Sequence, residues 1–293
     1  MSSLLGGLFA LLASLFKSGS ELTSKSHLNS ELDEYVAAWG YRAFALPVLT
    51  VLILIVGVPD IEPMFWVALA VGTPLNVLAT ILYMKALKHS DISLVSPLKA
   101  MTPMALLITS PIMIGEFASP FGIAGVFFVT IGVYLLKASS ASMDDVFAPF
   151  KAIGRERGAQ YALGVVVIYS ITANIDKVGV EASSPIFWTF AVHLVLAVIL
   201  LIIVQFKSED NVGQAFGEWK ALLPMGTLSG LGVAAQMFAL TYTLVVYVIA
   251  IKRTALLWNI LGGALFFGEE GLQERIVGGV FIVIGVVIIS ISL

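Results

Sequence analysis

Cysteine is absent from this 293-residue chain, and histidine occurs only three times. The missing cysteine excludes disulfides, thiol catalysis and cysteine-ligated metal sites. The three histidines, His27, His89 and His193, are scattered and do not show the spacing of a metal-binding motif. We therefore expect no metal ion and no other cofactor.

Charged residues are also scarce, at 12% of the chain. The net charge of −3 is small and no basic stripe occurs, so a nucleic acid is not expected as a partner. The phosphate-binding sequence GxxxxGK(S/T) is missing, so we do not expect ATP to be a direct source of energy for whatever this chain does. Paired carboxylates and a Ser/His/Asp pattern are missing too, which leaves an intramembrane enzyme only as a remote alternative.

What the chain has in abundance is hydrophobic length: 59% of its residues are hydrophobic, and its mean hydropathy is +0.99. A membrane-spanning helix needs about 20 apolar residues. The sequence therefore predicts an all-α, multi-pass protein of the plasma or inner cell membrane, with the lipid bilayer around it. The ten expected spanning segments are Ser3–Ser20, Tyr35–Gly57, Met64–His89, Asp91–Met113, Ser119–Ala138, Gly158–Glu181, Pro185–Phe206, Phe216–Thr241, Thr243–Phe267 and Leu272–Ser292.

The two halves of the chain repeat each other. Lys99 and Lys252 lie 153 residues apart, and the Gly-Glu pairs that begin at Gly115 and Gly268 are separated by the same 153 residues. The fifth and tenth segments repeat glycines at this offset, and small residues let membrane helices pack closely. We interpret these two segments as scaffold; the repeated glycines are Gly125, Gly132, Gly278 and Gly285.

The only long polar linker separates the halves. We predict a first five-helix repeat over residues 1–140, a linker over 141–157 and a second five-helix repeat over 158–293. Because five is odd, the two repeats must cross the membrane in opposite directions. Inverted repeats place a substrate site near the bilayer midplane, at the interface between the halves.

Three cations lie deep in apolar segments: Lys99 in the fourth, and Lys252 and Arg253 in the ninth. Lys252 is roughly 13 Å from either end of its segment, at about 1.5 Å per residue. A cation at such depth costs about 2.5–3.5 kcal/mol, so it should face protein or a water-filled cavity. Pro97 and Pro103 flank Lys99 and are expected to bend its helix.

These cations have no acidic residue at comparable depth on their own segments. An anionic substrate would supply the counter-charge, and a guanidinium suits a phosphate or carboxylate in bidentate geometry. Two alternatives stay open. Asp176 or another carboxylate forms a structural bridge with one of the cations, or one lysine is neutral and exchanges protons with a coupling gradient.

Further polar side chains share helical faces with these cations or with each other. Such faces would line a substrate cavity; the alternative is hydrogen bonding between helices. The candidate substrate-binding residues are Lys99, Lys252, Arg253, Ser96, Thr102, Asn76, Thr80, Tyr83, Gln236 and Asn259.

Charged residues near the ends of two segments form a candidate gate: Lys17 in the first, and Asp176 and Lys177 in the sixth. They would close the gate by ion pairing, or else reach toward the membrane interface. Glu116 and Glu269 are interpreted as structural caps of the helices that follow them. Arg42 and His193 are lone polar residues within segments, and we favour a structural role for the histidine.

Two five-helix repeats, each with an apolar helix, Gly-Glu and a Gly-rich closing helix, resemble the drug/metabolite transporter superfamily of the EamA type. The resemblance covers essentially the whole chain, and its most specific part is VYVIAIKRTALLWNILGGALFFGEE in the ninth segment. It implies a ten-helix transporter working by alternating access. Lys99 with Lys252 and Arg253 is similar to the plastid triose-phosphate translocators, where three cations hold a substrate phosphate.

The hypothesis is therefore a secondary transporter of a small organic solute bearing a phosphate or carboxylate, with a coupling proton or an exchanged anion as its second partner. The alternative is an exporter of amino acids or other zwitterionic or drug-like metabolites. A monomer and a homodimer both fit. Six lysines and arginines lie within the helices, namely Lys17, Arg42, Lys99, Lys177, Lys252 and Arg253. The other ten all fall on the side opposite the termini, so the positive-inside rule puts both termini outside. The resemblance implies both in the cytoplasm.

Overall fold

The computed structural model describes residues 2–27, 34–140, 147–207, 212–268 and 272–293, and all the regular structure in these ranges is helical. The first half forms α1 (Ser2–His27), α2 (Glu34–Ala43), α3 (Leu46–Val56), α4 (Pro63–His89), α5 (Ile92–Lys99), α6 (Thr102–Ile114) and α7 (Pro120–Ser140). The second half forms α8 (Ala148–Ile153), α9 (Arg157–Glu181), α10 (Pro185–Lys207), α11 (Val212–Gly217), α12 (Trp219–Tyr242), α13 (Val245–Ile251), the 3₁₀ turn η1 (Lys252–Thr254), α14 (Ala255–Phe267) and α15 (Leu272–Ile291).

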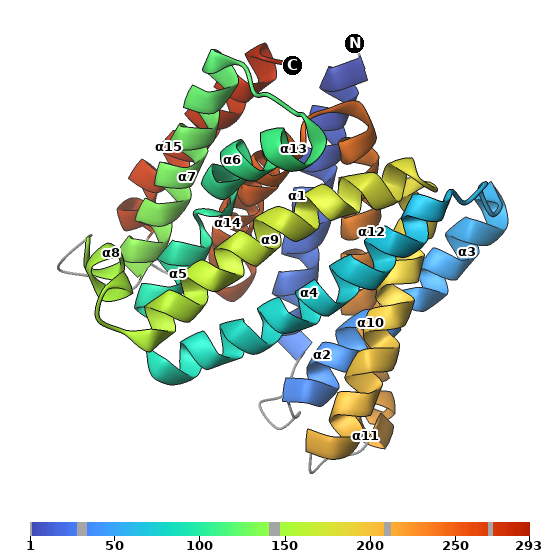
Figure 1. Ribbon diagram of the computed structural model, residues 1–293. Coiled ribbons are helices and arrows are strands. Elements are labelled where there is room, and N and C mark those ends of the chain that lie inside the picture. Colours follow the sequence, from blue (N-terminus) through green and yellow to red (C-terminus); the bar gives the residue numbers. More distant parts are fainter. Residues whose placement is uncertain (1, 28–33, 141–146, 208–211, 269–271) are drawn as a thin grey trace.

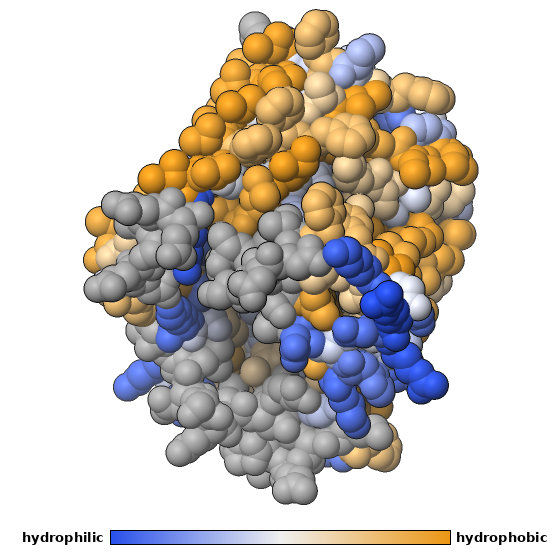
Figure 2. Space-filling model, turned by 90° about the vertical axis from the view of Figure 1, so that its left-hand side faces the viewer, coloured by the Kyte–Doolittle hydropathy of each residue, from blue (hydrophilic) through white to orange (hydrophobic). Residues whose placement is uncertain are grey.

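These helices confirm the predicted membrane-spanning architecture. Within the described ranges, nine helical stretches are long and apolar enough to cross a bilayer, and α15 adds the shorter apolar stretch Arg275–Ile291. Large apolar side chains point outward from them, such as Leu54 and Leu265, at 79% and 78% exposure. Figure 2 shows hydrophobic residues over the upper part of one face and hydrophilic residues gathered below, toward the end away from the termini.

The fourth and ninth spans are both broken at their deep cations. α5 ends at Lys99, and α6 begins at Thr102 with Pro103 in its first turn. α13 ends at Ile251, and Lys252 and Arg253 open η1. A third break, between α2 and α3, follows Arg42 within one residue. Broken helices free backbone groups at bilayer depth, and such breaks are tolerated where they line a cavity.

The closing helices α7 and α15 show the inversion of the two repeats directly. A Cβ on Gly125 would lie 2.8 Å from the carbonyl oxygen of Gly285, and one on Gly132 would lie 2.6 Å from that of Gly278. The lower-numbered glycine of α7 meets the higher-numbered glycine of α15, so these equivalent helices run antiparallel. They lie side by side in Figure 1.

The packing of α1 and α9 follows the same relation between the two repeats. α1 packs against α12 in the way that its counterpart α9 packs against α4, and both chain termini lie at one end of the molecule (Figure 1). Residues 141–146 of the expected linker lie outside the described residues. Its remainder contains α8, which packs against α5 and α9.

Candidate functional site

A cavity of about 420 Å³ lies between the two halves of the chain. Its walls come from α1, α2, α4, α5 and α6 in the first half and from α9, α10, α12, α13 and η1 in the second. The cavity therefore extends beyond the predicted third, fourth, eighth and ninth segments, which carry the candidate substrate-binding residues. Eight of the thirteen predicted site and gate residues line it: Lys17, Asn76, Lys99, Thr102, Asp176, Gln236, Lys252 and Arg253.

Three predicted residues lie behind the cavity wall or away from it. Ser96 accepts a hydrogen bond from Lys137 Nζ at 2.7 Å, one turn before Lys99. Thr80 is exposed and bonds back to the carbonyl oxygen of Asn76 at 2.9 Å. Asn259, on α14, accepts a 2.6 Å hydrogen bond from Ser18 Oγ.

The other two predicted residues, Tyr83 and Lys177, each contact a charged side chain. The Lys99 ammonium lies 4.0 Å from the centre of the Tyr83 ring and 5.4 Å from that of Tyr169. These cation–π contacts stabilise the charge without neutralising it. Lys177 forms a salt bridge with Glu116, at the end of the cavity nearer the termini.

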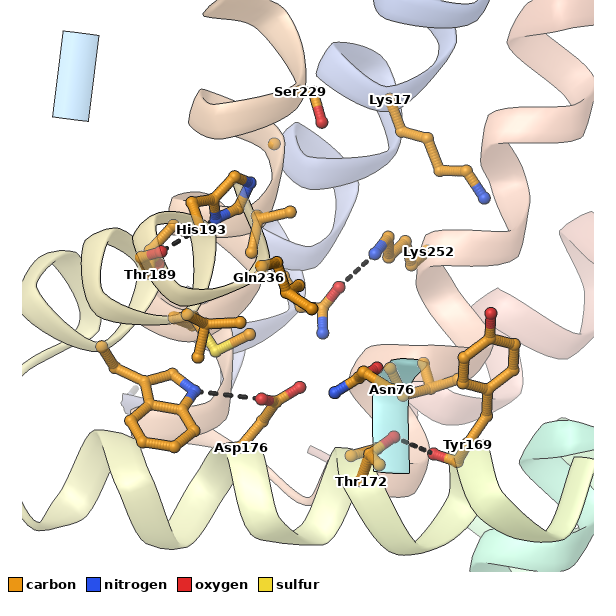
Figure 3. A pocket seen from close by; sticks show the side chains of 18 of the residues that line it. Lys17, Asn76, Tyr169, Thr172, Asp176, Thr189, His193, Ser229, Gln236 and Lys252 are labelled. Carbon is orange, nitrogen blue, oxygen red and sulfur yellow. Dashed lines mark hydrogen bonds between the residues drawn. The ribbon is translucent and has the colours of Figure 1, made fainter. Parts of the chain in front are cut away.

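Lys252 and Arg253 occupy the break between α13 and α14. Lys252 donates a hydrogen bond to Gln236 Oε1 from α12, as Figure 3 shows. The Nε of Arg253 is buried and has no hydrogen-bond partner among the described residues. Because an unsatisfied donor of a charged group is costly, this atom indicates a missing acceptor.

Asp176 is the acidic residue of the cavity wall. Its Oδ1 accepts a 3.0 Å hydrogen bond from Trp188 Nε1, an indole that is only 1% exposed. Gly179 makes this arrangement possible, because a Cβ there would lie 2.3 Å from the Trp188 ring. The side chain of Asp176 is thus oriented by α10, and Figure 3 shows it on the cavity floor formed by α9.

The sequence analysis missed the cavity face of α9. The polar side chains of Ser170 and Asn174 lie on the face of α9 that is turned toward α6. There Asn174 accepts a hydrogen bond from Ser110 at 2.8 Å and donates one to Thr109 at 3.1 Å. Tyr169, Thr172, Ala173 and Asp176 face the cavity instead. Counting back from Asp176 in helical steps would have found them, because they follow the spacing i, i+3, i+4, i+7.

A second missed face lies on α10, where Thr189, Val192, His193 and Leu196 repeat that spacing. His193 is fully buried; its Nδ1 lies 2.8 Å from the carbonyl oxygen of Thr189 and its Nε2 lies 3.4 Å from Arg42. Arg42 and Tyr41 line the cavity from α2, and Ser229 lines it from α12.

Positive charge dominates the cavity wall. It carries five basic side chains, Lys17, Arg42, Lys99, Lys252 and Arg253, against the single carboxylate of Asp176. Lys17 lies 3.6 Å from Glu21, but no other of the five has a carboxylate within 4.0 Å in the part of the chain that the structure describes. In the same ranges, no group of three potential ligands is arranged to hold a metal ion.

The loop after α6 contacts the start of α13 from the other repeat. Glu116 accepts a 2.8 Å hydrogen bond from the backbone N–H of Val245, the first residue of α13. The expectation that Glu116 caps the helix that follows it is therefore wrong: its carboxylate caps α13 of the other repeat, and in the first turn of α7 the backbone N–H of Gly122 donates to Ser119 Oγ instead. Glu269, its counterpart, lies outside the described residues.

Comparison with known proteins adds a family and a fold. Residues 4–138 and residues 156–291 each match the EamA-like transporter family. A solved structure titled "Crystal structure of protein" aligns with 97% of this chain and 95% of its own, with a TM-score of 0.77 and 16% identity. At that identity the likeness concerns the fold alone. No curated protein matches the chain.

Proposed function

The chain belongs to the EamA-like transporter family, and from this premise we propose that its central cavity binds a small organic anion during secondary transport. Members of the family are membrane transporters of small solutes, which fits the apolar, multi-pass fold. The anionic character of the solute and the mechanism are the parts that we infer.

The charge imbalance of the cavity carries the proposal. Five basic side chains share a space of about 420 Å³ with one carboxylate. Desolvated charges of one sign are unfavourable unless a counter-charge joins them, and at bilayer depth this cost is at its highest. A phosphate or carboxylate would supply acceptors for Lys99, Lys252 and Arg253.

The neutral lining supports an organic rather than an inorganic anion. Hydroxyl groups of Thr102, Thr172 and Tyr169 and the amide of Asn76 surround the cations. These groups donate and accept hydrogen bonds without adding charge, as a ligand site for a hydroxylated or carbonyl-bearing body requires.

A difference between the repeats supports alternating access. Lys17 and Lys177 occupy equivalent places in α1 and α9, each two residues before a glycine. The Lys177 side chain is 16% exposed and salt-bridged, whereas the Lys17 side chain lines the cavity and is 37% exposed. The cavity would therefore be closed toward the termini and open at the other end, and exchanging the two environments would reverse its access.

The orientation of the protein follows from its basic residues. The ends of α4, α7 and α10 and the starts of α9 and α12, all opposite the termini, carry lysine or arginine. We infer that this end faces the cytoplasm. A tag at the N-terminus should then be cleaved by protease added to intact cells, and protection of the tag would reverse the assignment.

Asp176 supports a second candidate, a zwitterion such as an amino acid. Figure 3 shows its carboxylate on the floor of the cavity, across from Lys252. An ammonium group at Asp176 and a carboxylate at Arg253 would satisfy both ends of such a molecule.

Thermal stabilisation of the purified protein tests the proposal, because a ligand that binds only the folded state raises its stability. We expect stabilisation by phosphorylated sugars or carboxylates, and its loss in Lys252→Ala and Arg253→Ala. Lys220→Ala, which removes an exposed lysine outside the cavity, is the matched control. Stabilisation by cationic compounds alone, or unchanged uptake by both cavity variants in proteoliposomes, would contradict an anion site.

A further inference from the structure

Arg42 is a cavity cation that the proposed anion site at Lys99, Lys252 and Arg253 does not use. It lies in the last turn of α2, next to the break before α3, just as Lys99 and Lys252 lie at breaks in their own spans. Each of the three broken spans thus presents a cation to the cavity.

The contacts of Arg42 leave its charge uncompensated. The guanidinium carbon of Arg42 lies 5.5 Å from the centre of the Tyr41 ring, and its Nη1 lies 3.4 Å from His193 Nε2. Among the described residues, no carboxylate lies within 4.0 Å of it. A guanidinium has five N–H donors, and one weak bond to an imidazole leaves most of them available to a ligand.

His193 positions this guanidinium. Because its Nδ1 lies 2.8 Å from the carbonyl oxygen of Thr189, that nitrogen must carry the proton and donate it. The Nε2 then has a free lone pair and accepts from Arg42. The histidine is fully buried, so its ring is fixed in place by α10 and holds Arg42 through a neutral contact.

The two cationic regions lie on different walls. Figure 3 shows His193 on the opposite side of the cavity from Lys252 and Lys17. Arg42 contacts this histidine, at 3.4 Å from its Nε2. The space between the two cationic regions is lined by neutral side chains such as Gln236, Asn76 and Thr172, with Asp176 on the floor.

We propose that Arg42, held by His193, forms a second anion-binding subsite, and that the substrate carries two anionic groups: a dicarboxylate or a phosphorylated carboxylate. One group binds at Lys252 and Arg253, and the other binds bidentately to Arg42. This inference rests on the proposed function, since it assigns a second contact to the same transported anion.

Pairs of compounds that differ by one anionic group test it. Succinate with butyrate, and 3-phosphoglycerate with glycerol 3-phosphate, are measured for binding to the purified full-length protein. The wild type should bind the doubly anionic member at least about tenfold more tightly, because its second anionic group gains charge-assisted hydrogen bonds to Arg42. Arg42→Gln should abolish that preference and leave binding of the singly anionic member nearly unchanged.

Further variants separate charge, position and fold. Arg42→Lys should keep part of the preference for the doubly anionic compound. His193→Leu should reduce this preference, and His193→Gln, which retains an acceptor, should reduce it less. Lys220→Gln is the control, and the thermal unfolding of each variant shows whether it folds. No preference in the wild type, or an equal loss for both members in folded Arg42→Gln, would overturn the second subsite.

The two proposals fail in different ways. If Arg253→Gln leaves the binding of both members unchanged, the anion site of the proposed function is wrong, whatever Arg42 does. If Arg253→Gln weakens both members but Arg42→Gln preserves the preference, the primary site stands and the second subsite is wrong. Failure of all four compounds to bind would overturn both.

Discussion

Gln236 shows how a single neutral side chain keeps the cavity positive. It is buried at 6% exposure, and its Oε1 accepts from the Lys252 ammonium across the gap between α12 and η1. A carboxylate of the same shape would satisfy the same donor and also neutralise it. The amide satisfies Lys252 yet leaves its charge available to a ligand.

Gln236→Glu should therefore weaken anion binding without unfolding the protein. The new carboxylate pairs with Lys252, and the lost attraction should lower affinity for an anionic ligand by at least about tenfold, equivalent to 1.4 kcal/mol. Binding is measured with whichever anion stabilises the wild type. Gln160→Glu makes the same change at an exposed position on α9 and should have no effect. Equal affinity in the Gln236 variant would show that Lys252 does not contact the ligand.

Single residues differ in how far the sequence alone could place them. Lys99, Lys252 and Arg253 were identifiable because a cation in the middle of an apolar run has few places to go except a cavity. Arg42 carries a weaker signal, since it lies only seven residues from the start of its predicted segment, and tyrosines such as Tyr169 are common near membrane interfaces. Their positions depend on which faces of α2 and α9 the neighbouring helices cover, and that is a property of packing.

The same limit holds for whole elements. The ten apolar runs predicted the spans to within about three residues, because bilayer thickness fixes their length, except that α1 continues from the predicted end at Ser20 to His27. Pro97 and Pro103 predicted a bend near Lys99, but the break at Lys252 has no proline within its span and was not foreseen. The repeat itself offered the signal, since Lys252 is the equivalent of Lys99.

At the scale of elements, the α7–α15 crossing brings the backbones of two equivalent helices into close contact. A Cβ on Gly278 would lie 2.7 Å from the carbonyl oxygen of Gly132 and 2.9 Å from the backbone nitrogen of Leu136. Its neighbour Gly279 points elsewhere, where a Cβ would lie 3.4 Å from the flexible end of Leu257.

Gly278→Ala and Gly279→Ala form a matched pair one residue apart. Alanine improves helix propensity by about 1 kcal/mol at either site. At Gly278 this gain is outweighed, because backbone atoms cannot yield and overpacking costs about 1–3 kcal/mol or more. We expect a lower unfolding temperature in detergent for Gly278→Ala and an unchanged or higher one for Gly279→Ala. The reverse order would mean that α7 and α15 are not in this close contact.

For the whole molecule, the proposed alternating access requires that the two ends of the cavity differ in their contacts. Toward the termini, Glu116 joins three elements: it lies in the loop after α6, binds Lys177 of α9 and caps α13 through Val245. Glu181 also lies near Lys177, at 4.0 Å, but its side chain is 61% exposed. The buried contact is therefore the one expected to hold this end closed.

The missing cysteine makes this proposal directly measurable, because one introduced thiol is the only one in the protein. Val233→Cys is a small change at the cavity wall, where the valine side chain is partly exposed. A membrane-impermeant maleimide should label this cysteine readily from the side opposite the termini and slowly from the terminal side, in vesicles whose sidedness a terminal tag reports.

Glu116→Gln in that background should raise the labelling rate from the terminal side by at least about fivefold, since a hydrogen bond between charged groups contributes about 1.5–3 kcal/mol. The glutamine still accepts from Val245, so the variant removes the ion pair and keeps the cap of α13. Glu181→Gln should leave the rate unchanged, because an exposed pair contributes little. Equal rates in all three proteins would mean that Glu116 and Lys177 do not close this end, and that the difference between Lys17 and Lys177 does not reflect alternating access.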